Sequence, residues 1–398
     1  MIRSIPDFAR NTMTRTRNCI RSTALAAAVA LLAAGPALAE TLRTEYQQIE
    51  LEAVAEGLNH PWGMAFLPDG DLLVTERGGR LLRVELDGTT TAIGGVPEVA
   101  ARGQGGLLDV TLHPAYEEDG NGWIYFTWSR AAPDGVDSAT ALSRGRLDGD
   151  RLVNVEQLFI QDRFSTPGRH YAGRLAWMPD GTLLMSIGDR GAEPRRAQDL
   201  ADHAGKLLRL NADGSAPADN PFHGRDDAAA EVWTYGNRNI QGLVVHPTTG
   251  EVWSVEHGPR GGDELNRMEA GSNYGWPIVS RGRDYRTGEK FFDDTRRSMD
   301  GVVDPYVDWT PGLHPSGLVV LTDATFPAWQ GNFLAGGLAT EQLRRIVFED
   351  GEVVHEERLI QGKVGRVRDL EVGPDGFVYL VTDNGENADG VWRIRPAD

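Results

Sequence analysis

One short unit recurs along the chain: an apolar run, a tight turn and a second apolar run. The six copies span residues 63–75, 106–128, 173–187, 242–255, 317–335 and 369–381. Their apolar residues alternate or are β-branched, a pattern typical of strands. In three copies the turn is Pro-Asp-Gly, which combines a preset φ, a side-chain-to-backbone hydrogen bond and a residue that accepts positive φ. Each copy is therefore predicted to be a β-hairpin.

Further apolar segments extend these hairpins, because residues 80–84, 344–348 and 391–394 read as outer strands. Six small antiparallel sheets in one chain predict an all-β fold, a six-bladed β-propeller. The strand-like segment Tyr46–Val54 is expected to join the last blade and close the ring. A pair of β-sandwiches is the alternative fold. No break in composition divides residues 40–398, which predicts a single propeller domain.

Residues 1–39 have the pattern of a secretory signal peptide rather than of the fold. Three arginines within 15–21 precede an apolar run at 24–34, and small residues at 37–39 form a cleavage site. The apolar run is too short to cross a membrane, although an N-terminal anchor helix is the alternative. We therefore expect cleavage after residue 39 and a periplasmic protein without membrane insertion.

Charge and cysteine content restrict the partners of the chain. It carries 58 acidic and 40 basic side chains, a net charge of −18, which becomes −22 when the leader's five arginines and one aspartate are removed. Such an acidic surface repels phosphates and argues against nucleic-acid binding. The single cysteine, Cys19, lies in the predicted leader. A disulfide scaffold, a zinc ribbon and an iron–sulfur protein are therefore excluded.

A histidine and an aspartate occur at the mouth of the third repeat. His170 comes just before the first strand of this repeat and Asp189 just after the second. A histidine in such a place can act as a general base near neutral pH. Because the two strands are neighbours in a hairpin, Asp189 can hold the second ring nitrogen. A structural or surface histidine is the other interpretation.

Two polar segments flank the fourth repeat. Arg238 and Asn239 precede its first strand and can recognise a carboxylate or a carbonyl, unless the segment is a plain turn. After its second strand, the backbone carbonyls of Gly258-Pro259 lie near the carboxylates of Asp263 and Glu264. These oxygens suit a hard cation such as Ca²⁺, although the acidic residues do not have the spacing of an EF-hand loop. An ordinary acidic loop without a metal is equally consistent with these residues.

Two arginines precede and enter the sixth repeat. Arg366 and Arg368 share one face of a strand because side chains alternate with a period of two. Two guanidinium groups on one face of a strongly acidic protein predict a bound anion. A pair of surface ion-pair donors is the alternative.

These segments together resemble a known family. They include Gly57–Gly63, Gly103–Asp109, Gly168–Tyr171, Gly236–Gly242, His257–Asn266 and Gly365–Asp369. In this order, from about Asn59 to Ile394, the chain resembles the soluble pyrroloquinoline quinone (PQQ)-dependent sugar dehydrogenases, the glucose/sorbosone dehydrogenase family, and within it the periplasmic aldose sugar dehydrogenase branch. The resemblance implies a six-bladed propeller that oxidises aldose sugars at C1 to lactones. It also implies PQQ and Ca²⁺ as cofactors, a soluble electron acceptor and a monomer.

The resemblance also implies roles for individual residues. His170 takes the place of the general base that removes the C1 hydroxyl proton, Asp189 orients it, and Arg238 faces both sugar and cofactor. Gln104 and Arg169 fall on the substrate side with His170. The residues implied in cofactor binding are Arg238, Asn239, Arg366, Arg368 and Trp309. Those implied in Ca²⁺ binding are Gly258 and Pro259 at the active site, and Glu264 and Tyr274 at a structural site.

The chain departs from the family pattern at one cofactor position. The family usually has a lysine in a Gly-x-Leu-Lys segment, whereas this chain has Ala339. Losing a charged hydrogen bond costs about 1.5–3 kcal/mol, and Arg344 and Lys363 are candidates to replace the charge. Two other functions follow if PQQ does not bind: a non-catalytic sugar-binding propeller, or a Ca²⁺-dependent lactone hydrolase.

Overall fold

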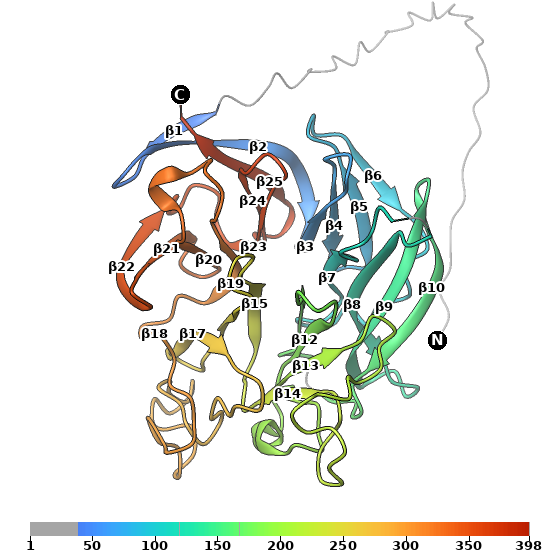
Figure 1. Cartoon of the computed structure of the whole chain (residues 1–398), viewed down its shortest axis with the longest axis vertical. Coiled ribbons are helices and arrows are strands. Elements are labelled where there is room, and N and C mark those ends of the chain that lie inside the picture. The colour runs from blue at the N-terminus through green and yellow to red at the C-terminus, as the bar shows by residue number, and fades with distance from the viewer. Residues whose placement is uncertain (1–38, 119, 167, 398) are drawn as a thin grey trace, which may run out of the picture. The chain divides into compact units, whose positions relative to one another are not determined.

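Six antiparallel sheets surround a central axis in the computed structural model, which describes residues 39–118, 120–166 and 168–397 (Figure 1). Blade 1 contains β3 (Pro61–Phe66), β4 (Leu72–Glu76), β5 (Arg80–Val84) and β6 (Thr90–Ile93). Blade 2 contains β7 (Leu107–Leu112), β8 (Trp123–Ala131), β9 (Ser138–Asp148) and β10 (Arg151–Ile160). Blade 3 contains β11 (Ala172–Trp177), β12 (Leu183–Ile187), β13 (Lys206–Leu210) and β14 (Val232–Tyr235).

The remaining three blades complete the circle. Blade 4 contains β15 (Ile240–Val245), β16 (Val252–Glu256), β17 (Asp263–Met268) and β18 (Val307–Trp309). Blade 5 contains β19 (Pro315–Val320), β20 (Phe333–Gly337), β21 (Gln342–Glu349) and β22 (Glu352–Leu359). Blade 6 contains β23 (Val367–Val372), β24 (Val378–Thr382), β25 (Glu386–Pro396), β2 (Gln48–Asn59) and β1 (Glu40–Arg43). Two short 3₁₀ turns are η1 (Pro194–Gln198) and η2 (Pro327–Trp329). The predicted six-bladed propeller is confirmed, whereas the predicted leader, except for its last residue Ala39, lies outside the described residues.

The ring closes through both ends of the domain. The first strands of the blades contact one another in the order β3, β7, β11, β15, β19, β23 and back to β3. Strand β2 pairs antiparallel with β25, with Leu51 opposite Ile394, so that the blue and red segments share one sheet in Figure 1. The predicted closing strand is confirmed, although it begins at Gln48 and continues to Asn59.

The apolar faces of the blades are buried against their neighbours. One cluster, for example, joins Leu73 and Leu81 of blade 1 to Ile124 and Phe126 of blade 2. A four-stranded sheet cannot bury both of its faces alone, so the alternating pattern is satisfied only when repeats stack side by side. This requirement is why six copies of one hairpin pattern produce a single ring.

The inner strands of the six blades share one feature close to where they begin. All six have a register irregularity there. At or beside it lie Gly63, Asp109, Gly173, Gly242, Gly317 and Asp369. Gly317 has φ +55°, and a Cβ at this position would lie 2.7 Å from the backbone nitrogen of Leu370. Glycine is therefore required at position 317, where blade 5 meets blade 6.

A buried arginine occupies the axis at this level. The Arg174 Nη1 atom lies 2.6 Å from Asp369 Oδ1 and 3.3 Å from Asp109 Oδ1. Its Nε donates to the Gln241 carbonyl at 2.6 Å, and its guanidinium lies 4.2 Å from the ring centroid of Trp62. One side chain of blade 3 thus links blades 1, 2, 4 and 6.

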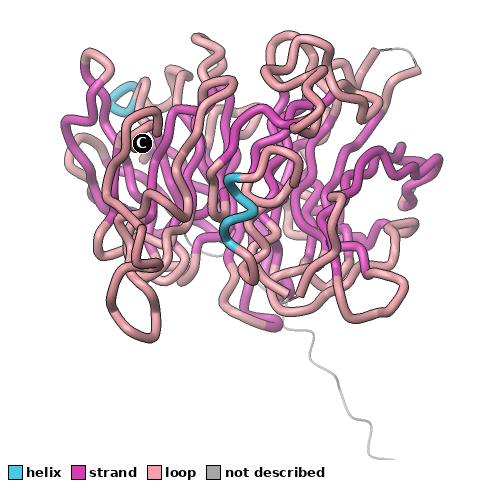
Figure 2. The backbone as a smooth tube through the Cα atoms, turned by 90° about the horizontal axis from the view of Figure 1, so that it is seen from below, coloured by secondary structure: helices cyan, strands magenta, loops and turns pink. Residues whose placement is uncertain are grey.

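The strand directions place particular loops at one face of the ring, seen from the side in Figure 2. Because the first and second strands of each blade are antiparallel, the start of the first strand lies beside the end of the second. Segments that precede β3, β11 or β15 therefore meet segments that follow β4, β12 or β16. None of the helices in the described part of the chain is long and apolar enough to cross a membrane.

Candidate active site

A cavity of about 290 Å³ opens at the face where the inner strands begin. Its lining comes from residues around the starts of first strands and after the ends of second strands. These residues include Trp62, Arg77, Gln104, Tyr171, Asn239, Gln241, His257, His314, Ala339, Arg366, Arg368 and Asp383. All six blades contribute residues at or just before their first strands, and blades 1, 4, 5 and 6 also contribute residues that follow their second strands, so the site exists only in the assembled ring.

His170 and Asp189 meet beside this cavity. The His170 Nδ1 atom lies 2.6 Å from Asp189 Oδ1, and the backbone N–H of His170 donates to Gln104 Oε1 at 2.7 Å. His170 has φ +52°, a conformation that few non-glycine residues adopt. Asp189 Oδ1 also accepts the N–H of Gly191 at 2.8 Å, and Asp189 Oδ2 accepts Nε1–H of Trp276 at 2.7 Å. Both oxygens of the carboxylate are therefore fixed.

The protonation states of this pair follow from its surroundings. Burial lowers the pKa of His170, and the positive charge of Arg238 lowers it further. Burial raises the pKa of Asp189, but the hydrogen bonds from His170 and Trp276 and the charge of Arg238 outweigh it, so the net shift is downward. Near pH 7 the imidazole is thus neutral and the carboxylate ionised. The ring proton lies on Nδ1, and Nε2 is left as a proton acceptor.

Arg238 and Asn239 lie next to this pair. The Nη1 of Arg238 donates to the carbonyls of His257 at 2.8 Å and Gly258 at 2.7 Å, while its backbone N–H donates to Glu256 Oε2 at 2.6 Å. Asn239 Oδ1 accepts the N–H of Ala172 at 3.2 Å. Asn239 lines the main cavity, whereas Arg238 lines a smaller cavity beside it.

The smaller cavity, of about 10 Å³, collects most of the predicted metal ligands. Gly258, Glu264 and Tyr274 line it together with Glu256. Burial raises the pKa of Glu264 to about 8, and the charge of Glu256 adds to this effect. Two desolvated carboxylates beside backbone carbonyls form a donor set that fits a hard cation. Pro259 does not line this cavity, and its ring lies against Gly282.

Arg366 and Arg368 line the main cavity from blade 6. Arg368 Nη2 donates to Asp383 Oδ2 at 2.6 Å and its Nη1 to Gln241 Oε1 at 3.0 Å. Arg366 Nε donates to the Asp383 carbonyl at 2.8 Å. Burial raises the pKa of Asp383, but Arg368 and His60 outweigh it and bring the pKa to about 2. Asp383 is therefore the ionised centre of a positively charged group.

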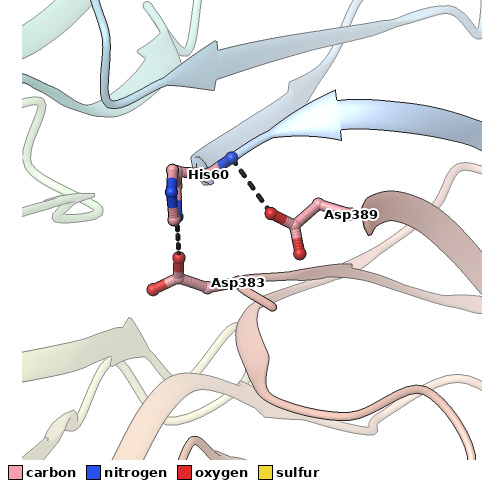
Figure 3. Close-up of side chains that lie close together, drawn as sticks. All are labelled: His60, Asp383 and Asp389. Atoms are coloured by element: carbon pink, nitrogen blue, oxygen red, sulfur yellow. Dashed lines mark hydrogen bonds and ion pairs between the residues drawn. The ribbon is translucent and has the colours of Figure 1, made fainter. Parts of the chain in front are cut away.

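His60 joins this group from the first blade (Figure 3). Its Nδ1 lies 2.6 Å from Asp383 Oδ1, and its backbone N–H donates to Asp389 Oδ2 at 3.0 Å. The arrangement resembles the His170–Asp189 pair, because both histidines have positive φ and use Nδ1. Here, however, the carboxylate also binds Arg368, so the contact connects blade 1 to blade 6.

Trp309 and Arg169 also lie outside the lining of the main cavity, as His170 does. Trp309 was expected to bind the cofactor, but it ends β18, the outermost strand of blade 4 and the one farthest from the axis. It lines a neighbouring cavity of about 250 Å³, and its Nε1 donates to Glu356 Oε2 at 2.8 Å. Arg169 is exposed and donates to the Gly191 carbonyl at 2.8 Å, outside the lining of the main cavity.

Several site residues were not predicted from the sequence. Asp383 follows the second strand of the sixth repeat as Asp189 follows that of the third, so an alignment of the repeats would have found it. Arg77 and His257 occupy similar places in the first and fourth repeats. Trp276 comes from the long excursion between β17 and β18, where no repeat pattern exists.

Comparisons with known proteins agree on one family. The model of the glucose/sorbosone dehydrogenase family matches residues 58–391. The aldose sugar dehydrogenase of Escherichia coli is 36% identical over 352 residues, which cover 87% of this chain and 93% of that protein. The crystal structure of the Escherichia coli aldose sugar dehydrogenase in the apo-form has a TM-score of 0.83 at 34% identity, with coverage of 88% and 100%. The PQQ-bound aldose sugar dehydrogenase from Streptomyces coelicolor has a TM-score of 0.71 at 29% identity, with coverage of 91% and 99%.

Proposed function

Because this chain belongs to the glucose/sorbosone dehydrogenase family, we propose that it is a PQQ- and Ca²⁺-dependent dehydrogenase that oxidises aldose sugars at C1 to lactones. The observation that carries the proposal is the neutral His170, held by the ionised Asp189 beside a cavity with arginine-rich walls. A base and an anion site at one place are what hydride transfer to an anionic cofactor requires.

The main cavity fits the chemistry of PQQ, a flat heterocycle with three carboxylic acid groups. Its walls carry Arg77, Arg366 and Arg368 against one carboxylate, Asp383. The Nε of Arg368 is buried without a hydrogen-bond partner among the described residues, so a donor remains for a ligand. The volume of about 290 Å³ lies just below the usual range for ligand pockets, about 300–1,000 Å³. When bound, PQQ would supply the acceptor for the hydride that leaves C1 of the sugar.

The protein's part in the reaction is the movement of one proton. The Nε2 of His170 accepts the proton of the C1 hydroxyl while C1 loses a hydride, which converts the C1–OH group into the lactone carbonyl. Asp189 stabilises the resulting imidazolium through Nδ1–H and keeps the ring in place. Gln104 fixes the backbone of His170 and lines the cavity, which places it on the substrate side.

Two positions would hold Ca²⁺. Glu264, Glu256 and the main chain of Tyr274 surround the small cavity and fit a structural ion. The carbonyls of Gly258 and Pro259 would hold the active-site ion. The Gly258 carbonyl already accepts a hydrogen bond from Arg238, but a carbonyl oxygen has two lone pairs and can accept a second partner.

The leader pattern supports export, so we place the reaction in the periplasm, with a monomeric enzyme that passes electrons to a soluble acceptor. Amino-terminal sequencing of protein recovered from the periplasmic fraction tests the predicted cleavage after residue 39. Elution as a single species of monomer size tests the oligomeric state.

A reconstitution assay tests the activity itself. Apoprotein mixed with PQQ and Ca²⁺ should reduce an artificial dye when aldoses are added, and omission of either PQQ or the sugar should abolish the reduction. Hydrolysis of lactones without PQQ would instead identify a Ca²⁺-dependent hydrolase. Sugar binding by calorimetry without any dye reduction would identify a binding propeller.

A further inference from the structure

The main cavity has more positive charge than its own residues neutralise. Three arginines line it, Arg77, Arg366 and Arg368, but only one carboxylate, Asp383. Both oxygens of that carboxylate are occupied, because Oδ2 accepts Arg368 at 2.6 Å and Oδ1 lies 2.6 Å from His60 Nδ1. An excess of cations in a chain of net charge −18 indicates that a multiply charged anion completes the site.

Arg77 is the arginine of this set that contributes least to the protein's own structure. Blade 1 contains two other arginines, and both form ion pairs: Arg80 with Glu76, and Arg83 with Asp71 at 2.6 Å. Within the described residues no carboxylate lies within 4.0 Å of the Arg77 guanidinium. Arg77 and Asp383 line the same cavity, and the charge of Arg77 contributes to lowering the pKa of Asp383.

The backbone and the stem of Arg77 are nevertheless fixed. Its N–H donates to the carbonyl of His60 at 3.0 Å, and its carbonyl accepts the N–H of Leu107 at 3.2 Å. Its side chain passes over Gly106, where a Cβ would lie 2.7 Å from Arg77 Cγ. The backbone of Arg77 and the start of its side chain are therefore held by contacts with two blades, which reduces the entropy that ligand binding would otherwise cost.

The two candidates to replace the charge missing at Ala339 are engaged elsewhere. Arg344 donates to Glu356 at 2.8 Å and lines the neighbouring cavity rather than the main one. Lys363 pairs with Glu40 in the first strand of the chain. Neither residue lines the main cavity, whereas Arg77 does.

We propose that Arg77 is a cofactor-binding residue, which contacts a carboxylate of PQQ from blade 1 and supplies the third cation that Ala339 does not. This assignment rests on the proposed function. It gives the three carboxylates of the cofactor three arginines, two from blade 6 and one from blade 1. The site is thereby built across the seam where β2 closes the ring.

Fluorescence titration of the apoprotein with PQQ tests the assignment without relying on activity. We expect Arg77→Gln to raise the Kd for PQQ roughly ten- to a hundredfold, the range for loss of a charged hydrogen bond. Arg83→Gln is the matched control, since it removes the same charge from the same blade but does not line the cavity. It should leave the Kd within a factor of two or so. Thermal melting checks that all variants fold equally.

The trimethyl ester of PQQ separates a charge contact from a change in shape. Wild type and Arg77→Gln should bind the ester equally, and Arg77→Lys should retain most of the affinity for PQQ itself. If Arg77→Gln bound PQQ as tightly as wild type, or lost as much affinity for the ester as for PQQ, the proposed role of Arg77 would be wrong. Either result would leave the proposed function intact. Failure of the wild type to bind PQQ would overturn the proposed function together with the role of Arg77.

Discussion

Trp276 donates its indole N–H to Asp189 at 2.7 Å, on the carboxylate oxygen opposite the one that faces His170. The candidate base is thus supported by a chain of contacts, from an aromatic residue of the blade 4 excursion to a histidine of blade 3. Each of the three residues should therefore affect the reaction differently. His170 moves the proton, whereas Asp189 and Trp276 hold the imidazole of His170 in place.

Replacement of His170 tests its role as the base. His170→Ala should bind PQQ as wild type does but lose roughly 10²–10⁴-fold in turnover, the usual contribution of general base catalysis. Fluorescence titration measures the binding and dye reduction measures the rate. Unchanged turnover in this variant would refute the assigned base.

The pH dependence of kcat/KM tests the role of Asp189. Because the pKa of His170 is lowered from 6.5, the acid limb of kcat/KM in the wild type should lie below pH 6.5. Asp189 raises the pKa of His170 through its hydrogen bond and its charge. Asp189→Asn should therefore move the acid limb to still lower pH, and reduce the maximal rate by roughly a hundredfold or more. An acid limb that moved upward would contradict the assignment.

Loss of the Trp276 hydrogen bond should move the acid limb of the pH–rate profile in the direction opposite to Asp189→Asn. Trp276→Phe removes one hydrogen bond that lowers the pKa of Asp189, so the pair should hold its proton to higher pH. The acid limb should move upward and kcat should fall about tenfold, the lower end for a charged hydrogen bond. Trp253→Phe is the control, since the Trp253 indole nitrogen has no partner among the described residues. If both variants gave the same profile, Trp276 would have only a packing role.

Stability should depend strongly on the arginine at the axis. Arg174→Gln leaves Asp109 and Asp369 buried without their cation and should lower the free energy of unfolding by about 3–5 kcal/mol. Arg195→Gln, which breaks an exposed pair with Asp294, should cost less than about 1 kcal/mol. Chemical denaturation at pH 8 measures both.

The pH dependence of this loss has a definite sign. Burial raises the pKa of Asp369 to about 7, far above its unfolded value, so the folded state binds the extra proton at acid pH. The Arg174→Gln defect should therefore be smaller at pH 5 than at pH 8. If the loss of unfolding free energy in Arg174→Gln became larger at acid pH, Arg174 would not act by neutralising the charges of Asp109 and Asp369.

Calcium should stabilise the fold through the small cavity. Adding Ca²⁺ to chelator-treated protein should raise the thermal midpoint, because an ion that binds only the native state stabilises it by mass action. Glu264→Gln removes one buried carboxylate and should greatly reduce this increase. Glu251→Gln is a control on the same blade, because Glu251 does not line the cavity. Equal increases in all three proteins would place the ion elsewhere.

Much of this arrangement could be predicted from the sequence, because it depends on local patterns. The hairpins follow from alternation, and Asp189 could be paired with His170 because both flank one hairpin. Trp276 could not be placed, since it reaches Asp189 from an irregular excursion 87 residues away in sequence. Arg77 and Asp383 come together only when the ring closes. The place of Trp309 in a neighbouring cavity could not be predicted, because the sequence gives no distance from the axis.

The proposed oxidation of aldoses by bound PQQ can be followed in the absorption spectrum of the apoprotein after PQQ and Ca²⁺ are added, recorded without an electron acceptor before and after addition of an aldose. We expect PQQ to bind with about one equivalent per chain, and its spectrum to change to that of the reduced cofactor when sugar is added. In His170→Ala the cofactor should bind but its spectrum should stay unchanged. A wild-type protein that binds no PQQ, or whose bound PQQ no aldose reduces, would contradict the account.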